Sequence, residues 1–170
     1  GDFTKIILAG HGSSYNSLYP AFLKISTQDV PVTLWQTAEL LHYGINQIDA
    51  HTLLVLNSQS GESAEAKNLL GKIKKTSRAC ILGFTNYTKS TLGENCDYLV
   101  ELNVGEEFGV AAGTYLNSVG LSLVFASLLC GENGQAVLGD FKSACDKMEQ
   151  YLENYQEKLE EIDGILGDVQ

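Results

Sequence analysis

The chain has 170 residues, of which 44% are hydrophobic, and a formal net charge of −10 at neutral pH. This length and composition indicate one compact domain with a full hydrophobic core. The balance of 21 acidic against 11 basic residues, with an isoelectric point near 4.6, argues against partners that need a basic surface, namely nucleic acids and anionic membranes.

Five short apolar runs in the first part of the chain predict β-strands, at 5–9, 32–35, 52–56, 79–84 and 97–102. Helical patterns lie between the first four runs, at about 14–25, 38–43 and 63–76. The strand runs are continuously apolar, as expected for strands that are buried on both faces. We therefore predict an α/β fold, a three-layer α-β-α sandwich around a five-stranded parallel sheet.

The stretch from Val110 to Cys130 has no charged residue and is long enough to cross a membrane. Hydroxyl and amide side chains interrupt it, however, and its flanks are Glu107 and Glu132 rather than lysine or arginine. We predict a buried central helix of a soluble domain, without a membrane partner.

A heptad pattern occupies the end of the chain, where apolar residues recur at alternating steps of three and four from Leu138 to Leu166. Acidic side chains lie between them, as on a solvated face. We predict one long amphipathic helix over 134–170, outside a domain that covers 1–133. Two interpretations stay open: the helix lies across its own domain, or it docks against a partner chain or bridges to a following domain.

The four cysteines lie 16, 34 and 15 residues apart, without a Cys-x-x-Cys pair or a flanking histidine pair. We expect reduced thiols in a cytoplasmic protein. The chain starts at Gly1 and its single methionine is Met148, so we interpret it as a cropped or processed piece.

Two loops rich in hydroxyls and glycines follow the first and third predicted strands and run directly into helices. They are Gly10–Ser14 and Ser58–Ser63. In a parallel sheet both loops lie at the carboxyl edge, where ligands bind. Helix N-termini offer free N–H groups and partial positive charge, and the hydroxyls of Ser13, Ser14, Ser58, Ser60 and Ser63 add donors. Serine and glycine are also ordinary caps and turns, but two such loops at one edge favour an anionic ligand, with a phosphate dianion as its natural form.

Competing motifs are incomplete. The dinucleotide fingerprint fails because Tyr15 stands at its third small position and the second strand ends in Trp35-Gln36 without an acid. No Walker loop, Gly-x-Ser-x-Gly elbow or His-Glu-x-x-His motif occurs. We therefore predict neither a cofactor nor a metal.

Three stretches together resemble the SIS (sugar isomerase) domain: residues 9–17, residues 57–63 (Asn-Ser-Gln-Ser-Gly-Glu-Ser) and residues 107–112 (Glu-Phe-Gly-Val-Ala-Ala). The resemblance covers residues 5 to about 130. It is strongest to the first of the two SIS domains in the isomerase half of glutamine:fructose-6-phosphate amidotransferases and in related deglycases of phosphorylated fructosamines.

The resemblance implies a flavodoxin-like sheet and a hexose phosphate ligand. Ser58, Gln59, Ser60 and Ser63 would hold the phosphate, Gly12, Ser13 and Ser14 would form the sugar-facing loop, and Val110 and Ala112 would lie near the pocket wall. The chain departs from the family where Ser13 and Ser63 replace threonine, where Ala112-Gly113-Thr114 replaces Ser-Thr-Lys and where His11 replaces a small cysteine. The last two differences leave the identity of the sugar open.

The resemblance places the catalytic base and a Schiff-base lysine in the second SIS domain, and a histidine in a neighbouring subunit. None of these is matched here, so the catalytic residues stay unknown, with His11 and Glu107 as weak candidates. We expect the N-terminal part of a tandem-SIS phosphosugar isomerase, aminotransferase or deglycase that works as a cytosolic homodimer. The alternatives are a non-catalytic sensor that binds a phosphosugar and regulates a partner, and a structural half-domain with a vestigial pocket.

Overall fold

The computed structural model describes residues 3–107 and 112–167. The chain divides into two compact units, Gly1–Glu132 (unit 1) and Asn133–Gln170 (unit 2). The two loops predicted to bind a ligand both belong to unit 1.

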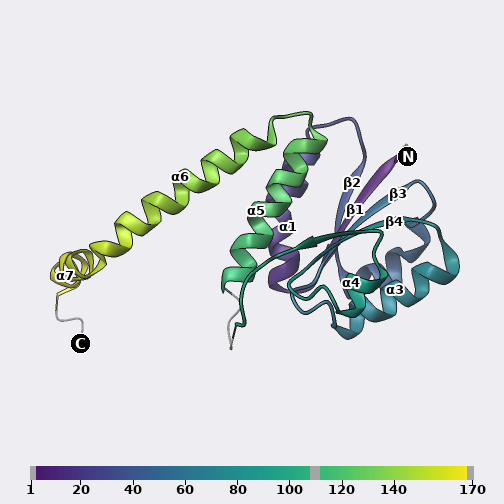
Figure 1. Ribbon diagram of the computed structural model, residues 1–170, viewed down its shortest axis with the longest axis horizontal. Coiled ribbons are helices and arrows are strands. Elements are labelled where there is room, and N and C mark those ends of the chain that lie inside the picture. The colour runs from purple at the N-terminus through teal and green to yellow at the C-terminus, as the bar shows by residue number, and fades with distance from the viewer. Residues whose placement is uncertain (1–2, 108–111, 168–170) are drawn as a thin grey trace. The chain divides into compact units, whose positions relative to one another are not determined.

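Unit 1 is built on a five-stranded sheet whose strands are all parallel (Figure 1). The strand order is β2-β1-β3-β4-β5. Leu8 of β1 pairs with Leu34 of β2 on one side and with Val55 of β3 on the other. The predicted α/β fold is thus confirmed. The strands are β1 Lys5–Gly10, β2 Val32–Gln36, β3 Thr52–Asn57, β4 Cys80–Thr85 and β5 Tyr98–Glu101.

Helices cover both faces of the sheet. On one face, α1 (Ser13–Ile25) and α5 (Ala112–Leu129) pack over a core that includes Phe84, whose ring meets the Phe125 ring edge-on at 6.3 Å. On the other face lie α3 (Ala64–Thr76) and α4 (Thr91–Asn95). The inner strands β1, β3 and β4 therefore have buried side chains on both sides, which explains why their runs do not alternate with polar residues, whereas the edge strands β2 and β5 are partly exposed.

The segment after β2 differs from the predicted helix over 38–43. It consists of one turn of α-helix (α2, Thr37–Glu39), a π turn (η1, Leu40–Gly44) and a 3₁₀ turn (η2, Ile45–Gln47). The structure also contains α4, which the sequence pattern did not reveal, because five residues are too few to show a helical period.

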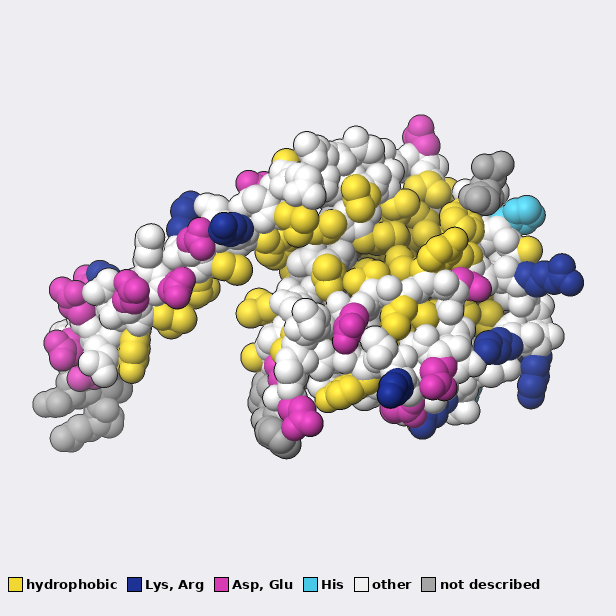
Figure 2. Space-filling view, viewed as in Figure 1, with side chains coloured by type: hydrophobic (Ala, Val, Ile, Leu, Met, Phe, Trp, Pro, Cys, Tyr) yellow, Lys and Arg dark blue, Asp and Glu magenta, His cyan; other side chains and the backbone are white. Residues whose placement is uncertain are grey.

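Helix α5 corrects the prediction of a buried central helix. Its buried residues are mostly small and polar, whereas Leu116 and Leu128 are 65% and 59% exposed. Hydrophobic side chains gather over α5 and the adjoining sheet face (Figure 2). Length and composition alone would let α5 cross a membrane, and one third of its residues are buried inside the protein.

Unit 2 consists of two helices rather than the predicted single one: α6 (Gly134–Glu153) and α7 (Tyr155–Leu166). The break falls at Asn154, whose side-chain Nδ2 donates to the Gln150 carbonyl at 3.3 Å. Asparagine favours such local bonds over helix interiors, which explains the break in the heptad pattern. No described residue of either helix is buried.

Candidate functional site

The two predicted loops lie side by side because β1 and β3 are neighbours in the sheet, with Gly10 paired to Asn57 at their carboxyl ends. Between the loops lies a cavity of about 190 Å³. Three lining residues come from the first loop and the start of α1, one from the start of α2, and five from the end of β3 and the loop that follows: His11, Ser13 and Ser14, then Thr37, then Asn57, Ser58, Gln59, Ser60 and Ser63.

The first loop depends on two glycines. Gly12 has a φ of 55°, which favours glycine, and its N–H donates to Gln36 Oε1 of β2 at 3.4 Å. A Cβ on Gly10 would lie 2.7 Å from backbone atoms of Ser14 and Tyr15. Gly10 therefore lets the start of α1 approach the end of β1 closely.

The second loop is held by the chain that follows β4. The Asn86 N–H and the Thr85 hydroxyl both donate to the Gln59 carbonyl at 3.0 Å, and the Leu92 N–H donates to the Gly61 carbonyl at 3.0 Å. Gly61 has a φ of 64°. These backbone anchors fix the loop while the side chains of Ser58 and Gln59 line the cavity.

The hydroxyls at the cavity fall into two groups. Ser60 Oγ accepts from the Glu62 N–H at 3.2 Å, and Ser63 caps α3 by accepting from the Ala66 N–H at 3.3 Å. Within 3–107 and 112–167, no hydrogen bond engages the hydroxyls of Ser13, Ser14 or Ser58. The free hydroxyls and the N-termini of α1 and α3 form a site for an anion.

Two residues of the cavity were not among the predicted site residues, Thr37 and Asn57. Asn57 is 1% exposed, and its Nδ2 donates to Ser17 Oγ at 2.8 Å and to the Ser14 carbonyl at 3.2 Å. Its Oδ1 is buried and has no partner in the described part of the chain. Since Ser14 offers a carbonyl acceptor, the amide orientation is set, and Oδ1 is an acceptor without a donor. The signal in the sequence was an asparagine at the end of an apolar strand.

The remaining predicted residues lie elsewhere. Gly12 shapes the loop but does not line the cavity, and Ala112 is exposed at the start of α5. Val110 lies outside the described residues. The start of α5 is nevertheless close to the first loop, because Thr114 and Tyr115 share a second, very small cavity with Ser13 and Ser14.

The two weak catalytic candidates have different surroundings. His11 is exposed and lines the cavity. Glu107 accepts from the Thr114 hydroxyl and the Gly113 N–H, both at 2.6 Å, and so caps the start of α5. The Thr114 hydroxyl and these N–H groups lower the pKa of the Glu107 carboxyl. That carboxyl is ionised at neutral pH and serves the helix.

Glu62, at the end of the second loop, gives the site a pH-dependent stabilisation. Its carboxylate pairs with Lys67 Nζ at 2.5 Å and accepts from the Thr91 N–H, and these contacts, Lys67 first, lower its pKa to about 2. Because the folded-state pKa lies below the unfolded value of about 4.5, the stabilisation is complete above that pH and disappears as the pH falls towards 2.

We expect the thermal midpoint of Glu62→Gln to lie below that of the wild type at pH 6 and to approach it at pH 3. An equal difference at both pH values would contradict this assignment.

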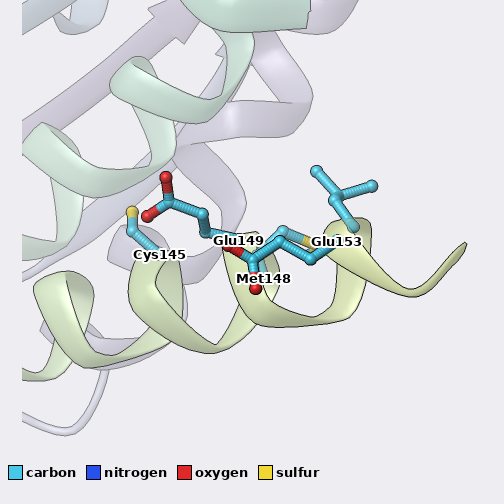
Figure 3. A pocket seen from close by; sticks show the side chains of 5 residues that line it. Cys145, Met148, Glu149 and Glu153 are labelled. Carbon is cyan, nitrogen blue, oxygen red and sulfur yellow. The ribbon is translucent and has the colours of Figure 1, made fainter.

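A larger hollow of about 610 Å³ lies along α6 in unit 2 (Figure 3). A single helix supplies its lining, namely Cys145, Met148, Glu149, Leu152 and Glu153. It has two carboxylates and no hydroxyl or amide, so it does not suit an anion. Among the described residues, no three His, Cys, Asp or Glu side chains cluster as a metal site would require.

Comparison with known proteins identifies the family. The sequence model of the SIS domain matches residues 2–129. The chain is 31% identical over 147 residues to the glutamine–fructose-6-phosphate aminotransferase (isomerizing) of Chlamydia caviae. The aligned region covers 86% of this chain and 24% of that protein. The enzyme of the same name from Pyrococcus horikoshii is 31% identical over 79% of this chain and 22% of its own length. The chain thus spans about a quarter of these relatives.

Solved structures show the same fold. The C-terminal domain of glucosamine-fructose-6-phosphate aminotransferase from Francisella tularensis matches with a TM-score of 0.71 and 25% identity, over 96% of this chain and 47% of that one. A ligand complex of an Escherichia coli CFT073 protein matches with a TM-score of 0.62 and 23% identity, over 81% of this chain and 76% of that one.

Proposed function

We propose, because this chain belongs to the SIS domain family, that unit 1 binds the phosphate group of a sugar phosphate between its two serine loops. The observation that carries the proposal is the cavity itself: free hydroxyls and two helix N-termini surround it, and none of the described residues that line it is a carboxylate. A phosphate dianion would gain hydrogen bonds and favourable dipole interactions there.

The roles follow from position in the cavity. Ser58, Gln59, Ser60 and Ser63 would bind the phosphate, and Gly12, Ser13 and Ser14 would face the sugar. His11 would contact the sugar, because it lies in the same loop as Ser13 and Ser14 and lines the cavity with them. Val110 and Ala112 would lie near the pocket wall, on the chain that leads into α5.

We further propose that the chain is the substrate-binding part of a phosphosugar isomerase, aminotransferase or deglycase. Its relatives are aminotransferases that are about four times as long. The residues that move protons between sugar carbons would then lie outside this chain. A second SIS domain or a second subunit would supply them, with residues 134–170 as the linker or contact helix and with the cytoplasm as the location.

Ligand binding is measured first by thermal shift with fructose 6-phosphate, glucosamine 6-phosphate, a phosphorylated fructosamine, inorganic phosphate and NAD. A ligand at 100 times its Kd should stabilise the fold by about 2.7 kcal/mol, which raises the midpoint by roughly 5 to 11 °C. Shifts with the sugar phosphates but not with NAD are expected. No shift with any sugar phosphate would contradict the proposal.

Ser60→Ala tests the second loop. We expect it to weaken sugar phosphate binding by about 1 to 3 kcal/mol, because the half-buried Ser60 hydroxyl would no longer donate to the phosphate. Ser26→Ala is the matched control, since Ser26 is exposed at the end of α1 and outside the cavity. Equal affinities of wild type and Ser60→Ala by calorimetry would remove this hydroxyl from the site.

A further inference from the structure

Asn57, at the carboxyl end of β3, differs from the other polar residues that line the cavity. Serine and threonine hydroxyls can turn to donate or to accept a hydrogen bond, whereas the side-chain oxygen of asparagine can only accept. Within residues 3–107 and 112–167, Asn57 Oδ1 is the one buried side-chain nitrogen or oxygen that lacks a hydrogen-bond partner.

Hydrogen bonds hold the Asn57 amide in this orientation. Its Nδ2 donates to Ser17 Oγ at 2.8 Å and to the Ser14 carbonyl at 3.2 Å. The Ser17 hydroxyl in turn donates to the same Ser14 carbonyl at 2.9 Å. A flipped amide would place Oδ1 against that carbonyl oxygen, and two acceptors would then face each other. Oδ1 therefore stays on the side of the amide that has no partner.

The neighbouring strand shows how a buried polar side chain at such a position is normally satisfied. Thr85 ends β4, next to β3, and is as buried as Asn57, but its hydroxyl donates to the Gln59 carbonyl at 3.0 Å. A buried acceptor without a donor destabilises the folded state, because it has given up its hydrogen bonds to water. Such groups are rare in folded proteins and call for a donor from outside the chain.

The cavity is where this donor can come from, since Asn57 is 1% exposed and lines the cavity. A water molecule there can supply the hydrogen bond in the free protein. A ligand that fills the cavity displaces such water, and it loses affinity unless it brings a donor of its own. Asn57 therefore adds a requirement that the serine hydroxyls do not: the ligand must carry a hydrogen-bond donor as well as a negative charge.

We propose that Asn57 Oδ1 accepts a hydrogen bond from a hydroxyl of the sugar, and so selects sugar phosphates over phosphate esters that have no hydroxyl. The inference rests on the proposed function of unit 1. The hydrogen bond from Asn57 to the Ser14 carbonyl places its side chain beside the loop that we assign to the sugar. The phosphate is the poorer partner, because an amide oxygen carries partial negative charge and would repel a dianion.

The test compares two probes on the full chain at about pH 8, well above the second pKa of about 6 of a phosphate ester. Fructose 6-phosphate carries hydroxyls, whereas methyl phosphate is then a dianion without any. Calorimetry gives the Kd of fructose 6-phosphate, and its displacement by methyl phosphate gives the second Kd. The ratio of the two Kd values measures the selection for a ligand with hydroxyls.

Asn57→Leu removes the acceptor and keeps a side chain of similar size. We expect the affinity for fructose 6-phosphate to fall by about 5- to 150-fold, the cost of leaving one hydrogen-bonding group without its partner in a buried site. The affinity for methyl phosphate should stay nearly the same, so the selection falls. Asn57→Asp keeps an acceptor at this place. Its added negative charge should weaken both probes, and the ratio should stay close to that of the wild type.

Ser122→Ala is the matched structural control. The Ser122 hydroxyl is buried and donates to the Ser17 carbonyl at 3.1 Å, so its loss disturbs the same turn of α1 without changing the cavity lining. We expect a lower thermal midpoint and an unchanged ratio. The thermal midpoints also show that each variant is folded.

The monodeoxy analogues of fructose 6-phosphate provide a measurement that needs no variant. One of them lacks the hydroxyl that donates to Asn57, and it should bind the wild type more weakly than fructose 6-phosphate by the same factor. Asn57→Leu should bind this analogue and fructose 6-phosphate alike, because the two changes remove the same hydrogen bond.

The outcomes separate this inference from the function on which it rests. A wild type that binds neither fructose 6-phosphate nor methyl phosphate would contradict the proposed function, and this inference with it. If the wild type binds both, an unchanged ratio in Asn57→Leu, or an equal loss of selection in Ser122→Ala, would overturn the role of Asn57 alone. The same holds if every monodeoxy analogue binds the wild type as tightly as fructose 6-phosphate.

Discussion

Gly10→Ala is expected to lower the free energy of unfolding by about 1 to 3 kcal/mol or more, the cost of forcing an extra carbon into packed structure. The new Cβ would lie 2.7 Å from the carbonyl carbon and oxygen of Ser14 and from the Tyr15 nitrogen. These are backbone atoms at the first turn of α1, so no side-chain rotation relieves the contact. The helix must move away from β1 and take Ser13 and Ser14 with it.

The measurement for Gly10→Ala is thermal unfolding, where we expect the midpoint to fall by roughly 2 to 12 °C. Gly71→Ala is the matched control, because Gly71 lies in α3 and an added Cβ would meet no atom within 4 Å. There alanine should stabilise the helix by about 0.5 to 1 kcal/mol. Midpoints that change equally in the two variants would show that the close contact at Gly10 is not important.

Gly61→Ala should abolish sugar phosphate binding in the accessible concentration range as well as destabilise the fold. A Cβ at this position would lie 2.0 Å from Ser90 Oγ, 2.6 Å from Ser90 Cβ and 2.9 Å from Thr85 Oγ1. The φ of 64° adds about 1 to 2 kcal/mol of strain for a residue with a side chain. The second loop can then no longer keep its anchors, and its hydroxyls leave the cavity.

Calorimetry with fructose 6-phosphate and with inorganic phosphate tests Gly61→Ala. Gly105→Ala serves as the control, since Gly105 is also in a loop but an added Cβ would find no atom within 4 Å. Wild-type affinity in Gly61→Ala would mean that the second loop does not position the ligand. Loss of binding in both variants would mean that the assay reports general destabilisation.

The pattern of apolar runs was enough to predict the α/β architecture and to put two serine-rich loops at the carboxyl ends of its strands. Continuously apolar strands separated by helical patterns are compatible with few folds other than a parallel sheet between helix layers. In such a sheet Gly10–Ser14 and Ser58–Ser63 lie at the same edge, because each follows a strand of the same direction, and the pairing of β1 with β3 in the structure brings them side by side. The helical pattern predicted at about 63–76 also agrees with α3, which Ser63 caps.

Which groups are free, which are hydrogen-bonded and which face water follows from packing between segments that are distant in the sequence. Asn57 in the cavity, Glu107 on the start of α5 and Ser90 against Gly61 all depend on contacts between residues that are several to dozens of positions apart. The same holds for α5, whose uncharged sequence indicated burial. Its small residues instead pack on α1, and Leu116, Leu128 and Leu129 are exposed. A periodic pattern records that a face is apolar, but the neighbour that covers that face is set by packing between segments distant in the chain.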